Sequence, residues 1–209
     1  MKEYLTVKGN ASAETVIKHS RFIASIARVS GREEAAAFLE KINKRYSDAT
    51  HNCYAYIADA DNREVKFSDN GEPSGTAGQP ILEVLKKNGL SEVCLVVTRY
   101  FGGIKLGASG LVGAYSSSAA AVLNEIEIIR RVPANSIELK CGYGVAGRVE
   151  GAVYSSGGMI KEKIYGEGVE FRCVFPKSVS FDGVFADITS GKGVLSLVGE
   201  EYIEEIVNE

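Results

Sequence analysis

The sequence has no tryptophan, and its 209 residues include only two histidines, two methionines, four prolines and four cysteines. The cysteines are widely separated and lack the paired spacing that builds a zinc site. We therefore expect reduced core thiols, with no metal and no cofactor. The cysteines are Cys53, Cys94, Cys141 and Cys173.

Long apolar runs are also missing. No stretch approaches the roughly 20 apolar residues of a membrane span, and the first eight residues contain no apolar segment of the kind found in an export signal. The expectation is a cytoplasmic protein with no membrane partner.

Charge of one sign is not in excess, because the net charge is −3. It is unevenly divided: residues 1–132 hold 17 Lys and Arg against 15 Asp and Glu, and residues 133–209 hold 7 against 12. Phosphates of a bound nucleic acid should therefore meet the first part, where the cations are. Ordinary scatter of surface charge is the alternative.

The hydrophobic content of 45% is enough for a substantial core, and the pattern changes near residues 130–134. We expect a first domain over residues 1–132 and a second over residues 133–209. In the first, apolar periodicity predicts strands at 13–18, 21–29, 51–58, 63–67 and 93–98, and helices at 31–46, 80–87 and 107–124. The strand at 93–98 is continuously apolar, which indicates a central strand covered on both faces.

The second part has a different order. Strands are predicted at 136–141, 159–165, 169–175 and 194–202, and helices at 144–156 and 178–190. This βαββαβ order is that of a ferredoxin-like domain, a scaffold that by itself proves no function. The predicted fold class is α+β.

Two glycine-rich loops lie where a strand should pass into a helix. They read SDNGEPSGTAG over residues 68–78 and TRYFGGIKLG over residues 98–107. Glycine lets a ligand approach the backbone, and a following helix N-terminus directs unpaired N–H groups outward, which favours an anion. Neither loop has the spacing of a phosphate-binding Walker A motif or of a dinucleotide fingerprint. Anion or nucleic-acid contact and a purely structural turn both remain open.

Specific roles follow for the side chains of these loops. Arg99 and Lys105 would neutralise phosphates or acidic side chains, Tyr100 would stack on a base, and Phe101 would face the core. Glu72 could instead pair with Arg99 and hold the loops together. The candidate ligand-binding or nucleic-acid-binding residues are Arg99, Tyr100, Gly102, Gly103, Lys105, Gly107, Gly71, Glu72, Ser74, Gly75 and Thr76.

Catalysis has weaker support. Asp69 and Glu72 could hold a metal or transfer protons, but Ser74 and Thr76 are more simply explained as caps of the next helix. A half-buried His51 beside a core Cys53 is the simplest interpretation of the histidine–cysteine pair. No catalytic residue is assigned.

Four segments together resemble the IMPACT/YigZ family: SRFIA at residues 20–24, ATHNCYAY at 49–56, the whole 68–78 loop, and VTRYFGGIKLG at 97–107. The second part resembles the ferredoxin-like domain that bacterial members append. Ser109 stands where the family usually has glycine, and Gly113 stands where arginine is common.

The resemblance implies a first domain similar to the second domain of a small-subunit ribosomal protein and to domain IV of elongation factor G. It implies a second domain similar to domain V of that factor. It also implies translational regulation, since the eukaryotic relatives act through protein partners of the amino-acid starvation response. The leading hypothesis is a non-catalytic binding protein that contacts RNA, the ribosome or a translation-regulator protein. An enzyme acting on a phosphorylated small molecule or nucleotide, and a structural assembly module, are the alternatives.

Overall fold

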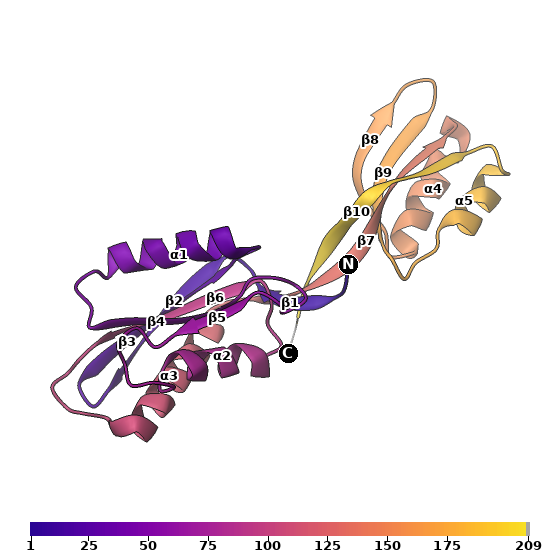
Figure 1. Cartoon of the computed structure of the whole chain (residues 1–209). Coiled ribbons are helices and arrows are strands. Elements are labelled where there is room, and N and C mark those ends of the chain that lie inside the picture. The colour runs from indigo at the N-terminus through magenta and orange to yellow at the C-terminus, as the bar shows by residue number, and fades with distance from the viewer. Residues whose placement is uncertain (208–209) are drawn as a thin grey trace. The chain divides into compact units, whose positions relative to one another are not determined.

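The computed structural model describes residues 1–207 and divides into two compact units (Figure 1). One unit contains residues 4–130 together with residues 206–207, and the other contains residues 1–3 and 131–205. None of the helices in the described part of the chain is long and apolar enough to cross a membrane. The fold is mixed α and β, as predicted, with the sheets described below antiparallel.

The sheet of the larger unit has the strand order β2-β3-β6-β4-β5. Its strands are β2 (Asn10–Ile17), β3 (Ser20–Arg28), β4 (His51–Ile57), β5 (Val65–Ser68) and β6 (Val93–Tyr100). β6 is central, and only its last residue is not fully buried. The prediction of a central strand covered on both faces is confirmed.

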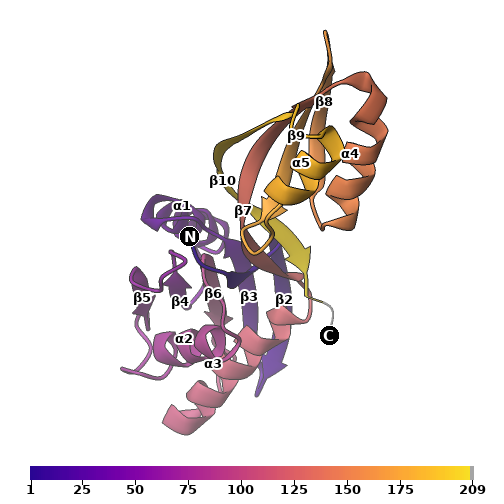
Figure 2. The ribbon, with the colours of Figure 1, turned by 90° about the vertical axis from the view of Figure 1, so that its right-hand side faces the viewer.

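Helices cover both faces of this sheet (Figure 2). α1 (Arg32–Arg45) packs on one face, where Ile42 meets Cys94 and Val96 of β6. α2 (Gly78–Lys87) and α3 (Gly107–Leu123) pack on the other face and enclose the larger apolar cluster. The division follows from strand alternation, because successive residues of β6 point to opposite faces.

Local signals explain where α2 ends. Lys86 and Lys87 occupy the last turn, where cations complement the helix dipole. Gly89 has φ +64°, and the N–H groups of Gly89 and Leu90 bond back to the carbonyls of Lys86 and Leu85. The predicted glycine termination is therefore present.

The smaller unit has the element order β7 (Ile128–Cys141), α4 (Tyr143–Ser155), β8 (Met159–Tyr165), β9 (Val169–Pro176), α5 (Asp182–Thr189) and β10 (Val194–Ile206). This is the predicted βαββαβ order. β9 lies between β7 and β8, and β10 pairs with the other edge of β7. Apolar residues of α4 and α5 pack with those of β7 and β9, around Phe171, Phe175 and Phe181.

Two features of the strands differ from the sequence prediction. β7 begins at Ile128, whereas a strand was expected only from Ser136, so residues 130–134 lie within a strand. β1 (Tyr4–Val7) was not predicted, and it pairs with β7, more than 100 residues away in the sequence. Pairing over such a separation leaves no local periodicity to detect.

Candidate functional site

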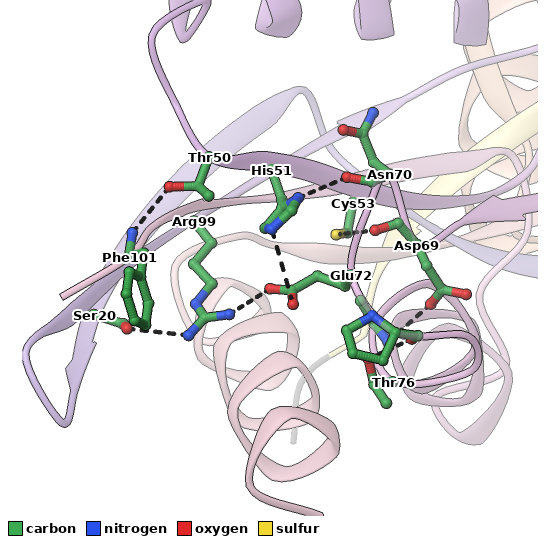
Figure 3. Close-up of polar contacts among 12 residues, drawn as sticks. Ser20, Thr50, His51, Cys53, Asp69, Asn70, Glu72, Thr76, Arg99 and Phe101 are labelled. Atoms are coloured by element: carbon green, nitrogen blue, oxygen red, sulfur yellow. Dashed lines mark hydrogen bonds and ion pairs between the residues drawn. The ribbon is translucent and has the colours of Figure 1, made fainter. Parts of the chain in front are cut away.

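The first glycine loop folds around the carboxylate of Asp69. Its Oδ2 accepts the N–H of Gly75 at 2.9 Å, and its Oδ1 accepts those of Ala77 and Gly78 at 2.9 and 2.8 Å (Figure 3). Burial raises the pKa of Asp69, but these three donors lower it more, so the net pKa lies below its ordinary value. The N-terminus of α2 is therefore already occupied by an anion of the protein itself.

This arrangement corrects the predicted capping. The hydroxyl of Thr76 donates to the carbonyl of Pro73 at 2.6 Å and does not cap α2, and Ser74 is exposed. Asp69 provides the cap from outside the helix because its two oxygens serve three amides, which a single hydroxyl cannot do.

A buried ion pair joins the first loop to the end of β6. Arg99 Nη1 donates to Glu72 Oε1 at 2.6 Å, and the two side chains are only 6% and 4% exposed. The same carboxylate oxygen accepts the hydroxyl of Tyr115 from α3 at 2.8 Å. His51 Nδ1 donates to the carbonyl of Asn70 at 2.8 Å, and its Nε2 lies 3.9 Å from Glu72 Oε2. Glu72 thus gathers groups from β4, β6 and α3.

The thiol of Cys53 completes this buried network. Its Sγ lies 2.9 Å from the carbonyl oxygen of Asp69 and 3.3 Å from the Tyr115 hydroxyl. Burial raises the pKa of Cys53 to about 12, and burial also raises the pKa of Tyr115. Both groups are therefore neutral, and Cys53 is not present as a reactive thiolate.

The second glycine loop is fixed to the sheet at its start. The N–H of Phe101 donates to Thr50 Oγ1 at 3.0 Å, and that of Gly102 donates to Ser20 Oγ at 3.2 Å. A Cβ on Gly102 would lie 2.0 Å from the carbonyl carbon of His19, so this position admits only glycine. Two amides of the loop are thus used within the protein.

One of the two aromatic residues of this loop, Phe101, lies opposite to the prediction. Tyr100 is partly buried, its hydroxyl donates to Asp48 at 2.8 Å, and its ring lies 5.6 Å from the guanidinium carbon of Arg21. Phe101 is 48% exposed, so the expectation that it faces the core is wrong. β6 ends at Tyr100, and strand alternation no longer directs the next ring into the sheet.

The structure therefore brings some of the predicted site residues together and separates others. Glu72, Arg99 and Gly71 meet around the buried pair, since Gly71 packs against His51. Thr76 is buried. The candidate residues that are exposed on the two loops are Gly71, Ser74, Gly75, Gly103, Lys105 and Gly107.

Sequence reasoning did not assign Ser20, Thr50 and Tyr115 to this site. Each contacts a loop residue at least 43 positions away: Tyr115 to Glu72, Thr50 to Phe101, and Ser20 to Arg99 and Gly102. Tyr115 lies on the apolar side of its helix. Its hydroxyl group among small residues was the one signal in the sequence that could have placed it in the site. The described residues contain no cluster of three His, Cys, Asp or Glu side chains suited to a metal.

The fold and site define a two-unit α+β protein whose glycine loops are fixed by a buried, internally paired polar network. The family model described as the Impact N-terminal domain matches residues 18–123, which include both loops. The chain belongs to the IMPACT family.

Full-length relatives agree with this assignment. The IMPACT family member YvyE of Bacillus subtilis is 41% identical over 210 residues, covering 100% of this chain and 97% of that protein. The family member YigZ of Escherichia coli is 35% identical, covering 96% and 100%. Protein IMPACT of Oryctolagus cuniculus is 34% identical over 93 residues, or 43% of this chain and 29% of that protein. A crystal structure of a hypothetical protein matches with a TM-score of 0.62 and 34% identity, covering 95% of this chain and 98% of its own.

Proposed function

We propose that this protein is a non-catalytic, translation-associated regulator whose second glycine loop, residues 101–107, contacts a protein partner. The setting in translation comes from the family resemblance. The observation that carries the mode of action is the exposure of Phe101 and Ile104, at 48% and 43%, on a loop whose start is anchored to the sheet. Exposed apolar side chains on a fixed support are typical of protein-binding surfaces.

A protein partner fits this surface better than RNA. Arg99, the expected phosphate contact, is buried and neutralised by Glu72, which leaves Lys105 as the cation on the exposed part of the loop. Phosphate-driven binding needs several exposed cations, because each contact adds to affinity by releasing counterions. Contact with RNA or the ribosome is therefore the alternative that the experiment below must separate.

The alternative of an enzyme acting on phosphorylated small molecules depended on a phosphate cradle at a helix N-terminus. Asp69 accepts the amides of Gly75, Ala77 and Gly78 just before and at the start of α2. Two amides of the second loop donate to Thr50 and Ser20. The glycines of the first loop thus serve to admit a carboxylate of the chain itself. This observation favours a binding function.

Photocrosslinking tests the proposal. A benzophenone amino acid is placed at Phe101 or at Ile104, and at Phe67 as a control, because Phe67 is an aromatic residue of similar exposure on edge strand β5. We expect protein adducts with translation components from positions 101 and 104 but not from 67. Adducts with RNA alone, together with RNA binding that weakens across a salt series, would assign the loop to nucleic acid instead.

A further inference from the structure

One buried donor at the site has no partner. The Nε of Arg99 is inaccessible to solvent and makes no hydrogen bond within residues 1–207, although the side chain is only 6% exposed. Buried polar groups in native proteins are nearly always hydrogen-bonded, and a donor on a charged guanidinium is among the most costly to leave unmatched. We therefore expect the Nε–H of Arg99 to bind a hydrogen-bond acceptor from outside the described chain.

The other nitrogens of this guanidinium are engaged on different sides. Nη1 donates to Glu72, and Nη2 donates to Ser20 Oγ at 3.3 Å, which is long for such a bond. Nε and Nη2 form one planar edge of the guanidinium, and two parallel N–H groups on such an edge match the two oxygens of a carboxylate. Glu72 lies at the far end and does not block this edge.

An exposed ring covers this edge. The Phe101 ring lies on the side of Arg99 that faces away from Glu72 (Figure 3), and its centre is 5.5 Å from the guanidinium carbon. Phe22 lies at the same distance but is fully buried, so it cannot move aside. The hydrogen bond of Phe101 to Thr50 uses its backbone N–H, and the half-exposed ring can rotate without breaking that bond.

We propose that the Nε edge of Arg99 recognises a carboxylate of the protein partner, and that the Phe101 ring is the cover displaced when this carboxylate enters. This inference rests on the proposed function and names the chemical group recognised at the same loop. The exposed apolar side chain of Ile104 beside Lys105 would contact residues flanking the carboxylate.

A carboxylate suits the edge better than a phosphate. Glu72 already balances the charge of Arg99, so the edge offers matched donors without net positive charge. A singly charged carboxylate gains the unmatched Nε–H bond and replaces the long Ser20 bond at Nη2, whereas a doubly charged phosphate would keep excess charge in a partly buried place. The ligand is therefore an acidic side chain or a chain terminus next to apolar residues.

Arginine Nε–H signals in NMR spectra of the full chain provide the test, with sodium acetate as the probe and sodium chloride at equal ionic strength as the reference. We expect one Nε–H resonance, shifted by the Phe101 ring current, to move with acetate and to saturate. Phe101→Ala should remove the ring-current shift and tighten acetate binding by about threefold or more, since the binding edge is then always uncovered. Phe67→Ala is the matched control and should leave the titration unchanged.

Several results would overturn the inference. An Arg99 resonance that ignores acetate in both the parent chain and Phe101→Ala shows that the edge is not a carboxylate site. Equal movement with chloride shows a salt effect only, and stronger saturation by sodium phosphate assigns the edge to phosphate. The titration uses acetate in place of the partner and tests only the carboxylate site, whereas crosslinking at 101 and 104 tests the proposed function. Either experiment can therefore fail while the other succeeds.

Discussion

The two glycine-rich loops of the larger unit use glycine for different purposes. In the first loop, backbone N–H groups close around Asp69, and the carboxylate of Glu72 is carried inward to Arg99. In the second loop, Gly102 lets the chain pass against the turn at His19, and the side chains that follow point outward. Loops of similar composition thus have different roles. The first loop, residues 68–78, is a support that pairs within the protein, and the second, residues 101–107, is a presenting surface with exposed side chains. A high glycine content indicates that some group comes close to the backbone, but it does not show whether that group is a ligand or another part of the chain.

The largest expected effect comes from breaking the support. Arg99→Ala leaves the Glu72 carboxylate buried without its cation, and the free energy of unfolding should fall by about 3–5 kcal/mol. Urea unfolding measures the change. The control is Arg21→Ala, which removes an ion pair with Glu14 on the same sheet whose side chains are 50% and 44% exposed, and it should cost about 0–1 kcal/mol. Equal losses for the two variants would show that the buried pair is not a support.

In the second loop, substitution of Gly102 should destabilise the protein much more than substitution of its neighbour Gly103. Gly102→Ala forces a Cβ to within 2.0 Å of backbone, so we expect the unfolding free energy to drop by about 3 kcal/mol. Gly103→Ala meets no atom within 4 Å and suffers only from its φ of +85°, at about 1 kcal/mol. Thermal denaturation of both variants gives the comparison. A Gly102→Ala protein as stable as Gly103→Ala would contradict the close approach.

Removing the cap tests the first loop alone. Asp69→Ala leaves three amides without their acceptor, and we expect a loss of about 1–2 kcal/mol in the free energy of unfolding. Ser74→Ala is the control, because Ser74 is exposed and does not cap the helix. A loss for Ser74→Ala as large as that for Asp69→Ala would restore the hydroxyl cap that the sequence suggested.

The carboxylate of Asp69 should also make the free energy of unfolding depend on pH in the acid range, by a smaller amount. The folded pKa of Asp69 is lowered, so its contribution to stability is complete above the unfolded value of about 3.9 and is lost as pH falls through the folded pKa. The stability difference between the parent chain and Asp69→Asn should therefore shrink on acidification below about pH 4. Urea unfolding at a series of pH values measures it. A constant difference over that range would show that the charge of Asp69 contributes nothing.

The smallest effect is expected at the presenting surface. Phe101→Ala should change the free energy of unfolding by no more than about 0.5 kcal/mol, since the ring is half exposed. Crosslinking from position 104 to the partner should nevertheless decline in this variant, because the partner loses its apolar contact with the Phe101 ring even though the Arg99 edge is uncovered. Differential scanning calorimetry and adduct yield separate the two outcomes. A large fall in melting temperature would make Phe101 part of the support.

Much of the fold could be predicted from local pattern. The central strand, the termination of α2 and the βαββαβ order all follow from periodicity and glycine position, and each is present. β1 and the first half of β7 could not be found this way, because their pairing joins segments more than 100 residues apart in the sequence.

The site was harder to predict. The Glu72–Arg99 pair was available as one of two alternatives, because opposite charges in two loops expected to adjoin are natural partners. The cap by Asp69 and the outward position of Phe101 were missed. The first depends on how one loop folds back on a helix, and the second on where β6 stops, which its sequence does not mark.

The contacts of Glu72 have a consequence for the coupling of folding and recognition. One carboxylate must receive Arg99 and Tyr115 and lie near His51, so the first loop is complete only when β4, β6 and α3 have all assembled. A chain with any of these segments detached would also lose the guanidinium position over which Phe101 lies. Binding of the proposed partner should consequently require the intact larger unit, and a molecule with one detached segment should lose this binding before it unfolds completely.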